Sequence, residues 1–182
     1  GSSWNQLGSD IDGEAAGDWF GASLSLDSDG DVVAVGAPKN DGGGTSSGHV
    51  RVFQYSGSSW NQLGSDIDGE AAGDESGYFQ SVSIDSDGSH VAIGAWENTG
   101  NGTAAGHVRV FQYSSGSWSQ LGSDIDGEAL GDYSGYSISI DDNGDRVAIG
   151  AGGNNAGGDD RGHVRVFQYS SGSWSQLGLS LI

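Results

Sequence analysis

The strongest constraint on this chain is a tandem repeat with a period of 56 to 58 residues. One segment reads SSWNQLGSDIDGEAAGD at 2–18, returns at 58–74, and recurs as GSWSQLGSDIDGEALGD at 116–132. A second segment, GHVRVFQYS, begins at Gly48, Gly106 and Gly162. Self-similarity at such a period is typical of repeat architectures in which each unit is one small structural element. The 182 residues therefore hold three units and part of a fourth.

Each unit is predicted to form four short β-strands. In the first unit, alternating leucine and serine predict a strand over 23–26, and an apolar run predicts a second over 32–37. The DSDGD segment between them is a turn, because Gly tolerates positive φ and Asp bonds the turn backbone. The third strand is expected over 49–55 and the fourth over 60–67. No window combines helical periodicity with caps, so we expect an all-β fold.

A four-stranded antiparallel unit of this length, repeated with turn signals, is typical of a β-propeller blade. We expect a β-propeller of three such blades of 56–58 residues. The expected division is an extra outer strand of the fourth type at 1–12 and blades at 13–69, 70–127 and 128–182, the last ending in a closing strand over Trp174 to Ile182. Three blades are fewer than the four to eight that close a ring. Completion by oligomerisation with further copies is therefore expected, and a fragment of a longer propeller is the alternative.

The unit resembles the FG-GAP repeat of integrin α-subunit propellers and their bacterial and algal relatives. In the first unit the resemblance rests on Phe20-Gly21-Ala22-Ser23, Asp29-Gly30-Asp31 and Val35-Gly36-Ala37-Pro38. Later units keep Gly94-Ala95 and Gly150-Ala151, with Tyr78-Phe79 and Tyr136 near the aromatic position. The resemblance implies an extracellular or cell-surface, non-enzymatic propeller used for adhesion or ligand recognition, often with calcium in the loop between strands one and two.

This sequence departs from the family in that calcium loop. The loop is one residue short, and valine stands where the family has a further Asp, at Val32, Val91 and Val147. Tight turns without metal are therefore expected there, since Asp and Gly are ordinary turn residues.

A second acidic cluster recurs in the DIDGE segment and the Asp that follows it. Hard cations such as Ca²⁺ take six or more oxygen ligands, and this spacing can supply several from one loop. The candidate metal ligands are Asp10, Asp12, Glu14, Asp18, Asp66, Asp68, Glu70, Asp74, Asp124, Asp126, Glu128 and Asp132. The glycine is fourth in the segment, whereas the EF-hand pattern has it sixth. A solvated acidic loop is therefore the competing interpretation, and no motif requires a cofactor.

The segments that differ most between units are the expected loops between strands two and three. Antiparallel order places them on the same face as the DIDGE loops. A fixed framework that carries varied loops is a common way to build a binding surface. The candidate ligand-binding residues are Lys39, Asn40, Asp41, Trp96, Glu97, Asn98, Asn154 and Asn155. Trp96 is suited to stacking on a sugar ring or packing against a protein partner.

Two further features recur or stand alone. His49, His107 and His163 begin the third strands, one in each unit, and a packing or hydrogen-bonding role is expected for them. Asn101 begins the only N-glycosylation sequon, which matters if a eukaryote secretes the protein.

Composition excludes several classes of function. With 25 acidic against 6 basic side chains and a net charge of −19, the chain would repel nucleic acid. No apolar run approaches the ~20 residues of a membrane span, and without Cys there is no disulfide or thiolate metal site. No motif places a nucleophile with its base, so an enzyme is not expected. We expect a non-enzymatic extracellular repeat module for adhesion or for binding protein or carbohydrate through the varied loops. The alternative is a structural protein that polymerises into a fibre or sheath by strand exchange.

Overall fold

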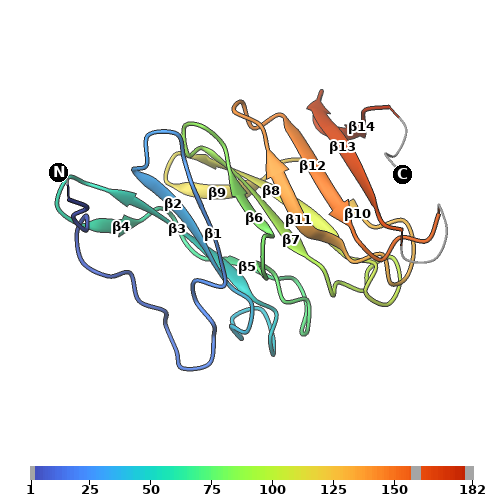
Figure 1. The fold of residues 1–182 in the computed structure, drawn as a ribbon, viewed down its shortest axis with the longest axis horizontal. Coiled ribbons are helices and arrows are strands. Elements are labelled where there is room, and N and C mark those ends of the chain that lie inside the picture. Colours follow the sequence, from blue (N-terminus) through green and yellow to red (C-terminus); the bar gives the residue numbers. More distant parts are fainter. Residues whose placement is uncertain (1–2, 157–160, 179–182) are drawn as a thin grey trace.

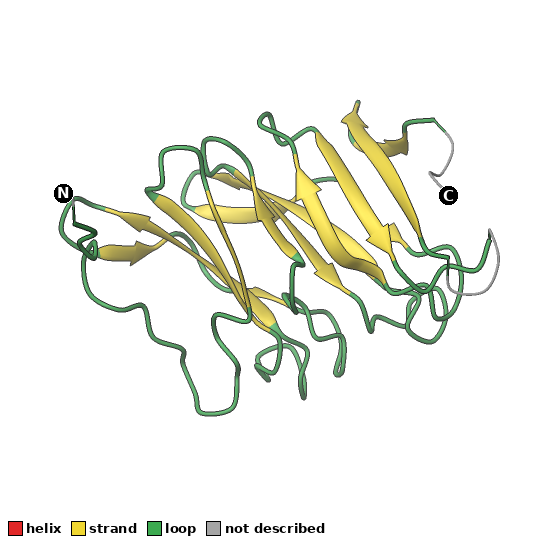
Figure 2. Cartoon of the chain, in the orientation of Figure 1, coloured by secondary structure: helices red, strands yellow, loops and turns green. Residues whose placement is uncertain are grey.

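The computed structural model describes residues 3–156 and 161–178. Within these residues the chain forms three antiparallel sheets and no helix, as Figure 2 shows. The sheets lie side by side in chain order, from the N-terminal end of the molecule to the C-terminal end (Figure 1). We call them blades 1, 2 and 3. The all-β, propeller-type architecture with four-stranded antiparallel blades is thereby confirmed. Among the described residues there is no helix long and apolar enough to cross a membrane.

The strands of each blade follow the repeat. Blade 1 contains β1 (Ser23–Leu26), β2 (Val32–Ala37), β3 (His49–Tyr55), β4 (Trp60–Gln62) and β5 (Ile67–Asp68). Blade 2 contains β6 (Val82–Ile84), β7 (His90–Ala95), β8 (His107–Ser114), β9 (Ser117–Gln120) and β10 (Ile125–Asp126). Blade 3 contains β11 (Ser134–Ile140), β12 (Arg146–Ala151), β13 (His163–Ser170) and β14 (Ser173–Gln176). The first three strands of blade 1 coincide with the predicted ranges.

The fourth strand is interrupted, unlike the continuous strand predicted over 60–67. Gln62 of β4 pairs with Phe53, and Ile67 of β5 pairs with Val50 on the same neighbour, β3. Two residues of β3 thus face four of the outer strand, which is a bulge. The bulge contains Asp66, which faces the first residue of β3, His49.

The extra outer strand expected at 1–12 is not formed, since described residues 3–12 are irregular. A strand there needs a third strand to pair with, and that strand would belong to a blade before blade 1. The segment nevertheless contacts blade 1, because Trp60 Nε1 donates to the Leu7 carbonyl oxygen at 2.9 Å. Of the closing strand expected at the C-terminus, β14 is formed, and residues 179–182 lie outside the described residues.

Two kinds of side-chain bond recur between each outer segment and the blade that follows it. The tryptophan indoles donate to leucine carbonyls in the pairs Trp60 to Leu7, Trp118 to Leu63 and Trp174 to Leu121. The arginines donate to aspartate carbonyls in the pairs Arg51 to Asp12, Arg109 to Asp68 and Arg165 to Asp126. Residues 3–12 therefore occupy the position of a fourth strand without its ladder.

The apolar core lies between blades. Between blades 1 and 2 it comprises Val32, Ala34, Val50, Val52, Ile67, Val82, Ile84, Val91, Ile93 and Phe111. An equivalent cluster joins blades 2 and 3. Backbones of neighbouring blades approach closely at glycine: a Cβ added to Gly94 would overlap the carbonyl oxygen of Gly135, and Gly36 meets Gly77 in the same way. The glycine of the recurrent V/I-G-A segment is thus required by packing between blades.

We predict that Gly94→Ala destabilises the protein by about 2 kcal/mol or more, because the methyl group forces two backbones apart in a packed core. Urea unfolding monitored by circular dichroism measures the change. Gly152→Ala is the matched control, since its Cβ would meet no atom within 4 Å. Equal stability of the Gly94→Ala variant and the native protein would contradict the prediction.

Candidate metal centres and loop face

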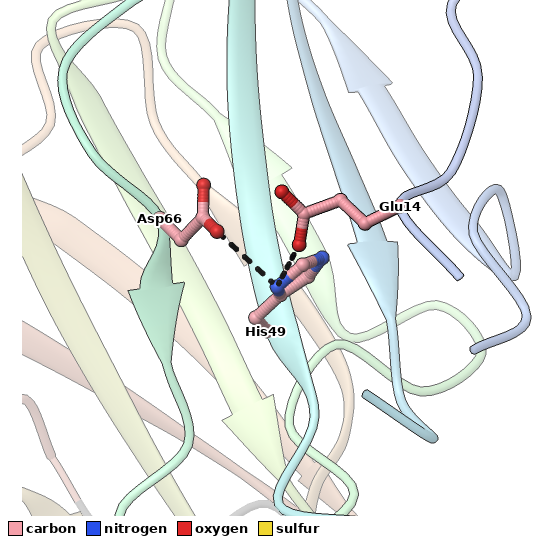
Figure 3. Close-up of side chains that lie close together, drawn as sticks. All are labelled: Glu14, His49 and Asp66. Carbon is pink, nitrogen blue, oxygen red and sulfur yellow. Dashed lines mark ion pairs between the residues drawn. The ribbon is translucent and has the colours of Figure 1, made fainter. Parts of the chain in front are cut away.

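A buried histidine lies between two carboxylates at the start of β3. His49 is 1% exposed, and its Nδ1 lies 3.7 Å from Asp66 Oδ2 and 4.0 Å from Glu14 Oε2 (Figure 3). These separations exceed hydrogen-bond length. Neither ring nitrogen of His49 has a hydrogen-bond partner. The three side chains form a concave set of potential ligands around an unsatisfied imidazole.

Blade 2 repeats this arrangement. His107 Nδ1 lies 3.9 Å from Glu70 Oε2 and 4.0 Å from Asp124 Oδ2, and His107 Nε2 is buried without a partner. Burial lowers the pKa of His107, and the nearby Arg109 lowers it further, while Asp124, Glu70 and Asp74 act in the opposite direction. The imidazole is therefore held toward its neutral form, the form that binds metals.

The aspartates and glutamates of both clusters are positioned by neighbouring side chains. Gln62 Nε2 donates to Asp66 Oδ1 at 2.6 Å, and Gln120 Nε2 donates to Asp124 Oδ1 at 2.7 Å. In each case the other carboxylate oxygen faces the histidine. The glutamates approach arginines on their far side, with Glu14 Oε1 3.9 Å from Arg51 Nη1.

Blade 3 has a different third member. His163 Nδ1 lies 3.7 Å from Glu128 Oε2. Burial lowers the pKa of the adjacent Arg165. The carboxylate nearby is Asp132, whose Oδ2 already accepts from Asn154 Nδ2 at 3.0 Å. The sequence equivalent of Asp66 and Asp124 is Ser180, which lies outside the described residues.

The twelve acidic candidates do not form one site per DIDGE segment. Each segment is divided between two blades: its first Asp faces the histidine of the preceding blade, and its Glu faces the histidine of the following blade. Asp10 therefore lacks a histidine in this chain and accepts from Gln6 instead. Asp12, Asp68 and Asp126 contribute their carbonyl oxygens to arginines. Sequence reasoning did not place the histidines beside these carboxylates, although their recurrence at the start of strand three was visible.

Hydrogen bonds to Asp18, Asp74 and Asp132 hold the loops between strands two and three in place. These aspartates accept hydrogen bonds from the amides of Asn40, Asn98 and Asn154 at 2.9, 3.0 and 3.0 Å. The asparagine carbonyls accept from the backbone N–H groups of Gly42, Gly100 and Ala156. All six side chains are buried. These three asparagines, expected to bind ligand, are thus engaged in holding the strand-two-to-three loops against the DIDGE loops.

The aspartates of the β1–β2, β6–β7 and β11–β12 turns bond to backbone. Asp27 Oδ1 accepts from the N–H groups of Asp31 and Val32. Asp85 and Asp141 close their own turns in the same way. In the second turn His90 Nδ1 lies 2.7 Å from Asp85 Oδ2, so this histidine, unlike His49, has a hydrogen-bonded partner.

The remaining loop candidates lie nearer the surface. Lys39 forms an ion pair with Glu75 and lies 5.6 Å from the Trp19 ring centre. Asp41 accepts from the Ser46 N–H. Glu97 is half-buried and Asn155 is exposed. Asn101 of the sequon is exposed, and its amide donates to the Gly127 carbonyl at 2.7 Å.

Trp96 stands at the centre of an aromatic cluster between blades 2 and 3. Its ring centre lies 5.3 Å from those of Tyr78 and Tyr133, and 5.8 Å from that of Tyr136. Trp96, Tyr133 and Tyr136, with Gly152 and Gly153, line an open apolar groove of about 380 Å³. The indole Nε1 of Trp96 has no hydrogen-bond partner. Sequence reasoning found Trp96 but not its contacts with Tyr133 and Tyr136, because these two tyrosines lie in the next unit.

These features together define a β-propeller-like repeat protein. Residues 10–53 match the model of the FG-GAP repeat, so the resemblance seen in the sequence is confirmed over that stretch. No curated protein matches the chain.

Solved structures of propeller type share the fold. The chain is similar to a proposed 6-phosphogluconolactonase from Bacteroides uniformis, with a TM-score of 0.56 and 11% identity over 87% of this chain and 39% of that one. Kuenenia stuttgartiensis hydrazine synthase and Saccharomyces cerevisiae Sqt1 each give a TM-score of 0.50, at 12% and 14% identity. The matched regions make up 92% and 90% of this chain, but only 38% and 36% of those two chains. The chain thus spans under two-fifths of these structures, and the similarity concerns the fold alone.

We predict that Asn98→Ala destabilises the protein by about 1–3 kcal/mol, because the buried Asp74 carboxylate loses a donor and the Gly100 N–H an acceptor. Denaturant unfolding measures the loss. Asn61→Ala is the control, since Asn61 is exposed and bonds only within its own turn. Equal losses of stability in both variants would show that the Asn98 hydrogen bonds stabilise the fold no more than the exposed bonds of Asn61 do.

Proposed function

We propose that this chain is a non-enzymatic, extracellular binding module that recognises a saccharide through the groove around Trp96. The observation that supports it is the aromatic cluster on the loop face. Tyr133 and Tyr136 are exposed at 38% and 43%, beside the half-buried indole. Exposed apolar groups that line a groove mark binding sites more often than isolated ones do.

The groove suits a neutral sugar ring better than a charged ligand. Aromatic faces stack on the apolar face of a pyranose ring, and Trp96, Tyr133 and Tyr136 supply such faces in the groove. The net charge of −19 repels phosphorylated or sulfated ligands. Extracellular placement is supported by the FG-GAP repeat itself, because such repeats are typical of surface proteins.

Glycan-array binding followed by calorimetry tests the proposal. We expect Trp96→Ala and Tyr136→Ala each to weaken binding of a neutral glycan about fivefold or more, since each aromatic contact contributes about 1 kcal/mol or more. Trp4→Ala is the matched control, because Trp4 is fully exposed and lies far from the groove in sequence. Absence of glycan binding, or equal loss in Trp4→Ala and Trp96→Ala, would refute it.

A second candidate function, assembly into a larger ring or fibre, is favoured by the two end faces of the molecule. On the N-terminal end face, Leu24 and Leu26 of β1 are 61% and 54% exposed, whereas their equivalents Val82 and Ile84 are 5% and 6% exposed against blade 1. On the C-terminal end face, Val164 of β13 is 40% exposed, whereas Val50 and Val108 are fully buried. Each end face thus lacks the neighbour that the repeat provides elsewhere.

The two end faces are complementary because the interfaces within the chain are built from the same positions. Ser25 Oγ accepts from the Ile84 N–H, and Ser83 Oγ from the Ile140 N–H; Ser139 is the next hydroxyl of this series and is exposed. Tyr133 packs on Trp96 between blades 2 and 3. The blade 1 equivalent of Tyr133 is Trp19, which is exposed, and the blade 3 equivalent of Trp96 is Gly152, beside which there is open space. A second copy of the chain is the occupant we propose, placed head to tail.

Light scattering across a dilution series tests this assembly. We expect at least twice the mass of the chain, and a shift to monomer in Leu24→Asp, because a carboxylate at the packed face is left without a partner. Leu130→Asp changes an exposed leucine outside both end faces and should leave the mass unchanged. A monomer at every concentration would rule out self-assembly without affecting the glycan proposal.

A further inference from the structure

We propose that the Glu14–His49–Asp66 and Glu70–His107–Asp124 clusters each bind one divalent first-row transition-metal ion of the Zn²⁺ type. The ligand atoms of each cluster lie within 4.8 Å of one another, and they come from three different segments that the fold brings together. The site differs in place and in donor chemistry from the turns between strands one and two.

The spacing fits ligands that share a cation better than it fits hydrogen bonds. Two atoms at about 2.1 Å from one tetrahedral ion are separated by about 3.4 Å. The histidine-to-carboxylate separations are 3.7 and 4.0 Å for His49, and 3.9 and 4.0 Å for His107. A shift of a few tenths of an ångström would bring each carboxylate to that separation from the histidine, and the ligand atoms already lie within 4.8 Å of one another.

The unsatisfied imidazole is the independent observation that points to a ligand. Buried polar nitrogens nearly always have a partner, and leaving one without costs free energy. His49 is buried among packed residues, has no bond to either nitrogen, and directs Nδ1 at two carboxylates, as Figure 3 shows. An ion coordinated between the carboxylates would satisfy the Nδ1 atom.

The donor set selects the metal. One imidazole with two carboxylates suits Zn²⁺ and its neighbours, whereas Ca²⁺ and Mg²⁺ take oxygen ligands. The two carboxylates balance the two charges of the ion. The glutamine bonds to Asp66 and Asp124 orient one oxygen of each toward the ion, as outer-shell partners do in known metal sites.

The chain contains its own controls. The Asp85–Asp87–His90 group has a similar composition, but His90 is already hydrogen-bonded to Asp85. In blade 3 the His163 nitrogens also have no hydrogen-bond partner, but the carboxylate beside them belongs to Asp132, whose Oδ2 already accepts from Asn154 and from the Ala129 N–H. We therefore expect no ion at either place among the described residues.

The test is calorimetric titration of Zn²⁺ into the full chain after treatment with chelator. Two ions per chain are expected, one after His49→Gln, none after His49→Gln with His107→Gln, and two after His90→Gln. Circular dichroism in chelator checks that each variant is folded. Should the histidine variants not fold, Asp66→Asn with Asp124→Asn, at positions nearer the surface, should abolish binding in the same way.

Four results would overturn the proposal. The first three are absence of Zn²⁺ binding by the native chain, two bound ions in the His49→Gln, His107→Gln variant, and an equal loss in His90→Gln. Displacement of Zn²⁺ by an equal concentration of Ca²⁺ would also overturn it, because an oxygen-only acidic site would then explain the binding. None of these results depends on the glycan groove or on assembly.

Discussion

Apolar packing between successive blades is the interaction on which the rest of this structure depends. A blade is a single sheet with two apolar faces, so it buries neither face by itself, and the two core clusters each take residues from two neighbouring blades. Glycine is needed where backbones approach most closely, at Gly36 and Gly94. Stability therefore resides in the contacts between repeats, as is general for repeat proteins.

The same interfaces place the polar sites. The outer strands of blades 1 and 2 each end in a DIDGE segment that crosses to the next blade, and its side chains are shared between the two. One aspartate faces the preceding histidine, one carbonyl accepts from the following arginine, and the glutamate faces the following histidine. The interruption of the outer strand between β4 and β5 makes this possible, because the bulge residue Asp66 leaves the regular ladder. The passage of the DIDGE segment from one blade to the next therefore accounts for both the polar clusters and the contacts between blades.

The two ends of the array show what this arrangement requires of a neighbour. Leu24 and Val164 are exposed because no further blade packs on them among the described residues, while their equivalents inside the array are buried. Residues 3–12 keep the indole and guanidinium contacts of a fourth strand but have no strand to pair with. The aromatic groove, in contrast, lies between two blades that are both present, so its walls are formed without a further copy.

The sequence by itself determined the periodic part of this protein. The repeat length, the alternation in 23–26 and 32–37, and the DSDGD turn specify the strands and the antiparallel blade, because those signals are local in the chain. Local signals also identified the acidic segments and Trp96 as places of interest. They could not divide the DIDGE segment between two blades or predict the interrupted outer strand.

Tertiary structure alone decided which side chains meet. Glu14, His49 and Asp66 are separated by 35 and 17 residues in the sequence and converge because β3 runs between two crossings. Asn98 stands in a polar segment that is typical of an exposed loop, yet its side chain is buried and donates a hydrogen bond to Asp74. Tyr133 and Tyr136 reach Trp96 only across a blade interface. Contacts of this kind depend on the angle and spacing of neighbouring sheets, which packing sets and which no single segment encodes.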